Sequence, residues 1–210
     1  MQAEWLPLIR LDLLFESVSG VIAMIIAYYA TKAYNLTEQK RLSDLSTGFL
    51  VLSIGMFSHV IGTWYFFVSL RIEGSVSPAP GTTMTVVTLA YHFLQIMAYL
   101  LFVVSTRRGG RAQQPEMALL MALPILIDVD LELITIFLIL VVVLQALLNY
   151  ATVRSRFAFY VLGGFFLIFL SHISLLTAGD SVFRYLVSQA LQLLGFLTLL
   201  LMVYKVGRVE

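Results

Sequence analysis

The sequence predicts an all-α, polytopic integral membrane protein whose seven transmembrane helices form one domain over residues 1–210. Of its 210 residues, 60% are hydrophobic and 12% are charged, whereas a soluble domain carries about 25% charged residues. Apolar runs recur along the whole chain, and most reach the roughly 20 residues that a spanning helix needs. Too few polar side chains are present to cover such a chain in water, so we expect it in the cell membrane, surrounded by lipid.

The seven expected helices follow one another closely along the chain. The longest expected connections are an inner loop over residues 32–47 and an outer loop over residues 71–83. The fourth apolar run is shorter than the others and contains Pro124, which makes it the least typical spanning segment. The expected helices cover residues 11–31, 48–70, 84–105, 113–127, 131–152, 157–178 and 183–204.

The distribution of basic residues indicates the orientation and favours the fourth crossing. With seven crossings and the N-terminus outside, only Arg10, Arg71 and Arg184 lie on the outer side, and the other ten of the thirteen basic residues lie inside. Without the fourth crossing, basic residues such as Arg154 and Arg156 would move outside. Because cytoplasmic loops are enriched in lysine and arginine, we expect seven helices with the C-terminus in the cytoplasm.

Composition also excludes several kinds of chemistry. The chain has no cysteine, which excludes disulfides, thiolate metal sites, iron–sulfur clusters and cysteine catalysis. The net charge of +1 indicates no nucleic-acid partner, and the expected partner is the lipid bilayer. The chain contains no P-loop, GxSxG or GxGxxG motif, so we do not expect an enzyme. Its first residues lack the basic stretch of a signal peptide, and we interpret them as mature protein.

Helices 1–3 and 5–7 of the predicted order have the same directions and weakly similar sequences. This pattern predicts a parallel 3+1+3 duplication in which the fourth helix is the connector and a pseudo-twofold axis runs along the membrane normal. The matching segments are Tyr29-Ala30-Thr31 with Tyr150-Ala151-Thr152, Ser58-His59 with Ser171-His172, and residues 92–95 with residues 189–192.

The 3+1+3 plan resembles the SWEET and PQ-loop families, whose sugar transporters share this architecture. The resemblance covers the order of helices and implies two parallel three-helix units, with transport as the associated activity. No Pro-Gln pair occurs in the chain, and the one proline at membrane depth is Pro124 in the connector, whereas those families place prolines within each triple. The resemblance therefore assigns no site residues.

Few ionisable residues are expected within the membrane, and they lie at similar depth in its outer half. They are Glu16, His59, His92 and His172. Such residues usually face the interior of a helix bundle and mark functional sites. Gly55 and Gly62 lie on the same helix face as His59, so this histidine either packs tightly against a neighbouring helix or faces a flat group.

Other polar residues extend these positions into stripes along single helix faces. The stripe with Glu16 consists of small residues suited to close helix contact. Asp12 lies nearer the surface, and Asp128, Asp130 and Glu132 share one expected outer turn. The stripes comprise Thr85, Thr88, His92, Gln95 and Tyr99; Ser188, Gln189 and Gln192; and Glu16, Ser19, Gly20, Ala23 and Ala27.

The leading hypothesis is that this His/Glu cluster binds a cofactor or ligand, and the most specific version of this hypothesis is a b-type haem. A haem in a helical bundle needs two imidazoles from different helices at comparable depth, and His59 and His172 meet this requirement. His92 and Glu16 would then tune the site. The polar residues Gln95, Gln189 and Gln192 would complete its lining.

Three alternatives remain open at the level of sequence. Glu16 and the three histidines form a valid donor set for a metal such as zinc, although no HExxH or HxxxH pattern is present. The same residues would serve a small proton-coupled transporter of a solute or an ion. The chain would also suit a sensor, or an accessory subunit of a larger membrane complex or homo-oligomer.

Overall fold

The computed structural model describes residues 5–73, 78–106, 131–178 and 181–206, and all of the regular structure in these ranges is helical. Each of the six described helices is long and apolar enough to cross a membrane, which confirms the prediction of an all-α, polytopic membrane fold. The helix predicted over residues 113–127 lies outside the described residues. The helices are α1 (Trp5–Thr37), α2 (Lys40–Glu73), α3 (Pro78–Thr106), α5 (Leu131–Val153), α6 (Arg156–Leu176) and α7 (Val182–Val206).

The prediction of a long loop over residues 32–47 is wrong. Only Glu38 and Gln39 separate α1 from α2, and both helices extend beyond the apolar runs. The connecting sequence contains three leucines, two lysines and an arginine, which are good helix formers in water as well. The length of an apolar run therefore predicts the part of a helix that can lie in lipid, and it does not predict the residues at which the helix begins and ends.

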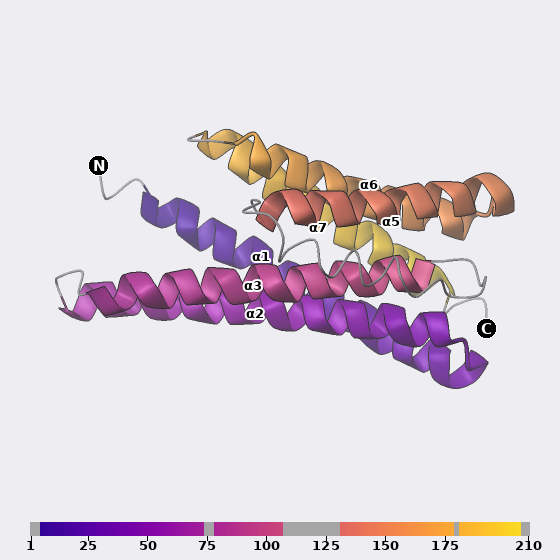
Figure 1. Ribbon diagram of the computed structural model, residues 1–210, viewed down its shortest axis with the longest axis horizontal. Helices are drawn as coiled ribbons and strands as arrows, with labels where there is room; N and C mark the ends of the chain where they lie inside the picture. The colour runs from indigo at the N-terminus through magenta and orange to yellow at the C-terminus, as the bar shows by residue number, and fades with distance from the viewer. Residues whose placement is uncertain (1–4, 74–77, 107–130, 179–180, 207–210) are drawn as a thin grey trace.

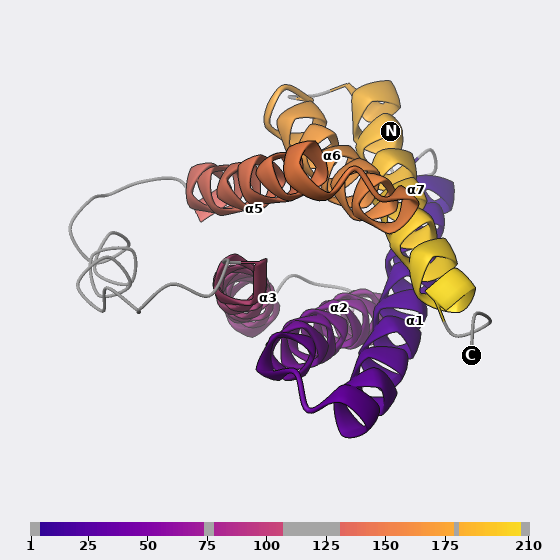
Figure 2. The same ribbon diagram turned by 90° about the vertical axis from the view of Figure 1, so that its right-hand side faces the viewer.

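The six helices form a ring of neighbours made of two three-helix units. In the first unit α2 packs against α1 and α3, and in the second unit α6 packs against α5 and α7. The units meet through contacts between α1 and α7 and between α3 and α5, as the end-on view in Figure 2 shows. We call the end of the bundle where α1 begins the N-terminal end, and the end where α7 finishes the C-terminal end.

Helices at matching places in the two units run in the same direction. In Figure 1, α1, α3, α5 and α7 run towards the C-terminal end, and α2 and α6 run back. Because α3 and α5 run in the same direction, α3 finishes towards the C-terminal end, whereas α5 starts near the middle of the bundle.

The turn between α1 and α2 closely resembles the turn between α5 and α6. Each preceding helix ends at a non-glycine residue with positive φ, Glu38 (54°) and Arg154 (48°). The N–H of Glu38 donates to the Tyr34 carbonyl at 2.7 Å, and that of Arg154 donates to the Tyr150 carbonyl at 2.8 Å. Tyr150 thus has the same place in its turn as Tyr34 has in the other turn.

The centre of the bundle is filled by large rings from both units. The ring centroids of Phe49 and Phe102 are 4.6 Å apart, and those of Phe102 and Phe165 are 5.4 Å apart. Such pairs stabilise a core beyond the area that they bury. We call this group the aromatic core; its fully buried members are Phe49, Tyr99, Phe102, Phe165 and Phe196.

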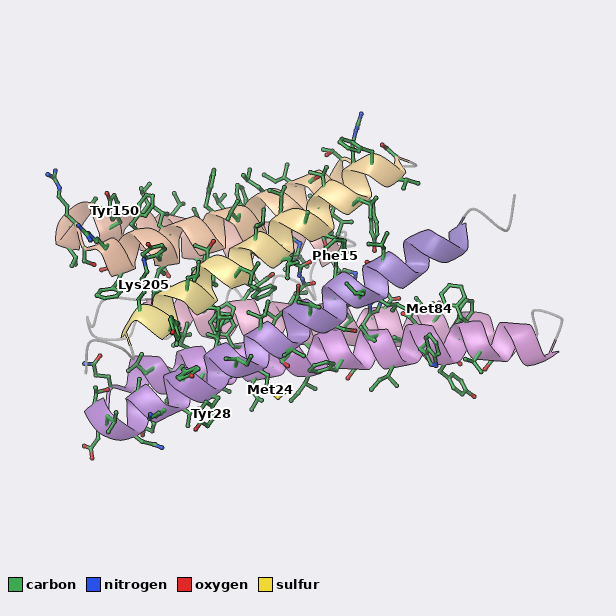
Figure 3. All side chains as sticks on the ribbon, turned by 180° about the vertical axis from the view of Figure 1, so that it is seen from behind. Phe15, Met24, Tyr28, Met84, Tyr150 and Lys205 are labelled. Carbon is green, nitrogen blue, oxygen red and sulfur yellow. The ribbon has the colours of Figure 1, made fainter. Side chains whose placement is uncertain are left out.

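The outer surface of the bundle is apolar. Figure 3 labels Met24 and Tyr28 on the outward side of α1, and these side chains are 44% and 66% exposed. Leu148 and Phe183 in the second unit are similarly exposed. A soluble protein rarely presents apolar side chains on all sides, whereas a lipid-facing surface requires them.

Glycines bring α6 and α7 into close contact. A Cβ atom built on Gly195 would lie 2.8 Å from the carbonyl oxygen of Gly164 and 2.7 Å from a side-chain carbon of Ile168. A Cβ atom built on Gly164 would lie 2.5 Å from the side chain of Leu199. Neither position has room for a side chain, so small residues set the spacing of this helix pair.

Candidate functional site

A polar cavity of about 270 Å³ lies in the N-terminal half of the bundle and is lined by side chains from all six described helices. We call it the N-terminal cavity. It brings together every residue that the sequence suggested for a site. These residues are Glu16 from α1, His59 from α2, His92 and Gln95 from α3, His172 from α6, and Gln189 and Gln192 from α7.

Glu16 and His59 form a close pair between α1 and α2. His59 Nδ1 lies 2.8 Å from Glu16 Oε2 and 3.0 Å from Glu16 Oε1, so the ring N–H donates to the carboxylate. The His59 ring stacks on Tyr91 with centroids 4.8 Å apart. Glu16 is buried, and the carboxylate therefore fixes the orientation of this imidazole in a largely dry environment.

The small-residue face of α1 explains how this pair comes together. Ser19, Gly20 and Ala23 are buried, and Ser53 of α2 donates a hydrogen bond of 2.9 Å to the Gly20 carbonyl. Small side chains let the two helix backbones approach closely. The prediction that Glu16 heads a buried face of its helix is confirmed.

A second pair, Glu132 with His172, lies between α5 and α6. His172 Nδ1 is 2.7 Å from Glu132 Oε1, and both residues are buried. His172 Nε2 is 2.8 Å from the hydroxyl oxygen of Tyr99 and 3.4 Å from Gln95 Nε2. Because Nδ1–H donates to the carboxylate, Nε2 accepts the Tyr99 hydroxyl, and both nitrogens of His172 are engaged.

Sequence reasoning missed the role of Glu132. It was grouped with Asp128 and Asp130 in an outer turn; those two residues lie outside the described part of the chain, whereas Glu132 points into the cavity. A signal was present, because Glu132 precedes Arg154 by as many residues as Glu16 precedes Glu38.

The glycines beside His59 make room for side chains of α3. A Cβ atom on Gly62 would lie 2.6 Å from Val87, and one on Gly55 would lie 3.3 Å from Leu94. Both interpretations of this glycine pattern hold in part, because the glycines pack tightly against α3 and the flat Tyr91 ring of α3 lies 3.8 Å from a Cβ atom on Gly55 and stacks on His59.

The arrangement does not fit a haem held by His59 and His172, because Glu132 and Tyr99 engage both ring nitrogens of His172. A metal site finds no better support. Within residues 5–73, 78–106, 131–178 and 181–206, no group of three or more histidine, aspartate or glutamate residues is arranged to hold a metal ion.

The polar stripes of α3 and α7 face the same cavity. Thr88, His92 and Gln95 line it, Tyr99 continues the stripe into the aromatic core, and Thr85 is exposed. Ser188 and the two glutamines of α7 line it as well. Further lining residues that the sequence did not single out for the site are Tyr91, Ser171, Leu175 and Tyr185, together with Asp12.

A second cavity of about 230 Å³ lies towards the C-terminal end, and we call it the C-terminal cavity. The hydroxyl of Thr106 on α3 donates to the side-chain oxygen of Gln145 on α5 beside it. The aromatic core separates the two cavities along the helices: Phe196 lies between Gln192 and Leu199 on α7. The polar residues that line the C-terminal cavity are Gln39, Ser105, Thr106, Gln145 and Asn149.

Comparison with known proteins adds a match over part of the chain. Residues 13–91 match the model of a family of unknown function, DUF7521. The matched segment begins within α1, ends within α3 and includes both members of the Glu16–His59 pair. No curated protein sequence and no solved structure matches the chain.

Proposed function

We propose that this membrane protein binds a small polar ligand in the N-terminal cavity, and that the two Glu–His pairs exchange protons as the ligand binds. The observation that carries the proposal is that Glu16–His59 and Glu132–His172 line one buried cavity. Ionisable groups inside a membrane protein are costly and usually serve function. A carboxylate that orients an imidazole holds a proton at a defined atom, which suits proton transfer.

The proposed architecture is a seven-helix, 3+1+3 duplication in a single domain. Its support is that α1, α2 and α3 correspond in direction, neighbours and turn geometry to α5, α6 and α7. The carboxylate of each pair lies on the first helix of its unit and the histidine on the second. Parallel units require the chain to return across the membrane between Thr106 and Leu131, which the fourth helix over residues 113–127 would do.

The proposed orientation places the N-terminal cavity on the outer side of the cell membrane. The C-terminal end of the bundle bears Lys40, Arg154, Arg156 and Lys205, whereas the N-terminal end bears Arg184 among the residues whose side chains are described. In Figure 3, Tyr150 and Lys205 lie towards one end, and Phe15 and Met84 lie towards the other. The positive-inside rule then assigns the C-terminal end to the cytoplasm.

A second candidate function is proton-coupled transport of the same ligand. The N-terminal cavity and the largely apolar C-terminal cavity lie on either side of the aromatic core, whose buried rings form a barrier between them. An alternating-access transporter requires such a closed barrier and two units that can move against each other around the binding site. Two three-helix units that meet through α1 with α7 and α3 with α5 would be the moving parts in such a mechanism.

Ligand binding is expected to raise the thermal unfolding midpoint of the detergent-purified protein by several degrees. A ligand that binds only the folded state stabilises it by mass action. The measurement is a thermal scan against a panel of small cationic, neutral and anionic solutes. Glu16→Gln and Glu132→Gln are expected to lose the response, whereas Glu38→Gln, which removes an exposed acid in the α1–α2 turn, should keep it. A wild-type protein that responds to no solute contradicts the proposed function.

A measurement of proton movement across the membrane distinguishes proton-coupled transport from ligand binding without transport. Proteoliposomes that contain a pH-sensitive dye are expected to change their internal pH when the binding solute is added outside, and protein-free liposomes are not. Substitution of Glu16 or Glu132 by glutamine should abolish the signal while the protein stays folded. Binding without any flux would contradict the transport candidate and assign the cavity to a sensor or an accessory subunit.

A further inference from the structure

We propose that the ligand of the N-terminal cavity is a small organic cation with N–H donors, such as a guanidinium or primary ammonium ion. This inference rests on the proposed function and names the chemical class of its ligand. It is carried by the charge of the lining, by two buried oxygens that lack a hydrogen-bond donor, and by the aromatic side chains and size of the cavity.

The lining of the cavity is acidic. It contains the carboxylates of Asp12, Glu16 and Glu132, and no lysine or arginine is among the described residues that line it. His172, whose Nε2 accepts the Tyr99 hydroxyl, is a neutral imidazole and leaves the charge of Glu132 in place, so the lining keeps a negative charge even where a protonated His59 balances Glu16. His92 is the third imidazole of the lining, and an imidazole is mostly uncharged at neutral pH. A cation therefore complements this cavity, and an anion does not.

Two oxygens in the lining call for a hydrogen-bond donor. Gln95 is 2% exposed, and its Oε1 atom has no hydrogen-bond partner among the described residues. Its amide nitrogen faces His172 Nε2 at 3.4 Å, which leaves the oxygen for another group. Asp12 Oδ1 is also buried without a partner in the described part of the chain. Buried acceptors of this kind cost free energy until a donor reaches them, and both require N–H or O–H groups.

The aromatic side chains and the volume of the cavity further restrict the chemical class of the ligand. Tyr91 and Tyr185 line the cavity, where an aromatic ring can attract a cation, although one face of the Tyr91 ring is stacked on His59. The volume of about 270 Å³ lies just below the range of about 300–1,000 Å³ that is usual for ligand pockets, so the ligand is small. An organic cation with several N–H donors fits these features better than a metal ion, which needs three or more clustered ligands.

Guanidinium and urea test the inference because they share one shape and differ in charge. Guanidinium chloride at millimolar concentration, far below denaturing levels, is expected to raise the thermal unfolding midpoint. Equal concentrations of urea, sodium chloride and sodium acetate are not. Titration calorimetry should give an affinity that Asp12→Asn lowers about tenfold or more, as for a hydrogen bond to a charged group. Asp44→Asn removes the same charge near the C-terminal end and should leave the affinity unchanged.

Gln95→Leu provides a second variant that keeps the charge of the cavity. Loss of this one acceptor is expected to weaken guanidinium binding roughly two- to tenfold. A response to guanidinium no larger than that to urea or sodium overturns the inference, and so does full affinity in Asp12→Asn. Binding of an acetate or neutral solute that depends on Glu16 would overturn the inference while the proposed function stands. A protein that responds to no solute overturns both.

Discussion

Replacement of His172 by alanine is expected to lower the unfolding free energy by about 3–5 kcal/mol, the usual cost of leaving one member of a buried ion pair alone. The His172 side chain is 4% exposed and bonds Glu132 on one nitrogen and Tyr99 on the other. Its loss strands a carboxylate and a hydroxyl in the bundle interior. Equilibrium unfolding in mixed detergent micelles measures the effect.

His59→Ala is the matched control for this variant. The His59 side chain is 18% exposed, against 4% for His172, so the substitution removes less buried surface, and it strands a carboxylate alone rather than a carboxylate and a hydroxyl. We expect a loss of about 1 kcal/mol, in the range measured for polar contacts between membrane helices. The double variant His172→Leu with Glu132→Leu should recover part of the loss, because no unpaired charge stays buried. Equal losses for His59→Ala and His172→Ala would show that burial does not distinguish the pairs.

Gly195→Ala is expected to destabilise the protein by about 1–3 kcal/mol through overpacking. The new Cβ atom would lie 2.8 Å from the Gly164 carbonyl oxygen and 3.2 Å from the Ile168 backbone nitrogen. Both are backbone atoms that cannot rotate away, so α6 and α7 must separate. The same unfolding assay measures this change.

Gly163→Ala provides the control at a neighbouring position. Its Cβ atom would find only the Thr198 side chain within reach, at an ordinary contact distance of 3.8 Å. Because alanine favours helix over glycine, we expect no loss and a gain of up to about 1 kcal/mol. Equal destabilisation by both substitutions would contradict the assignment of Gly195 to a close backbone contact.

The sequence predicted those features of the site that depend on one helix at a time, namely which residues of a helix face the interior of the bundle. The cost of placing an ionisable group in lipid drew attention to Glu16 and the three histidines, and helix periodicity placed Gln95 and His92 on one face. All of them line the N-terminal cavity. This part succeeded because the face of a helix that avoids lipid can be identified from its own sequence.

The sequence did not predict contacts between residues of different helices, because these contacts depend on which helices are neighbours in the bundle. Glu132 stands at the start of an apolar run among other acids, where a position inside the bundle and a position in water give the same pattern. The partner of His172 on α3, Tyr99, follows from the neighbours of each helix, which one sequence does not specify. Hypotheses that required the histidines to face one another, such as the haem site, depended on that missing information.

His172 makes one hydrogen bond within its own three-helix unit and one to the other unit. Its bond with Glu132 joins α5 to α6 within one unit, as the bond between Glu16 and His59 joins α1 to α2 within the other. Its bond with Tyr99 instead joins the second unit to α3 of the first. A sliding motion between the units would carry both proton-holding pairs along intact and would break the Tyr99 contact.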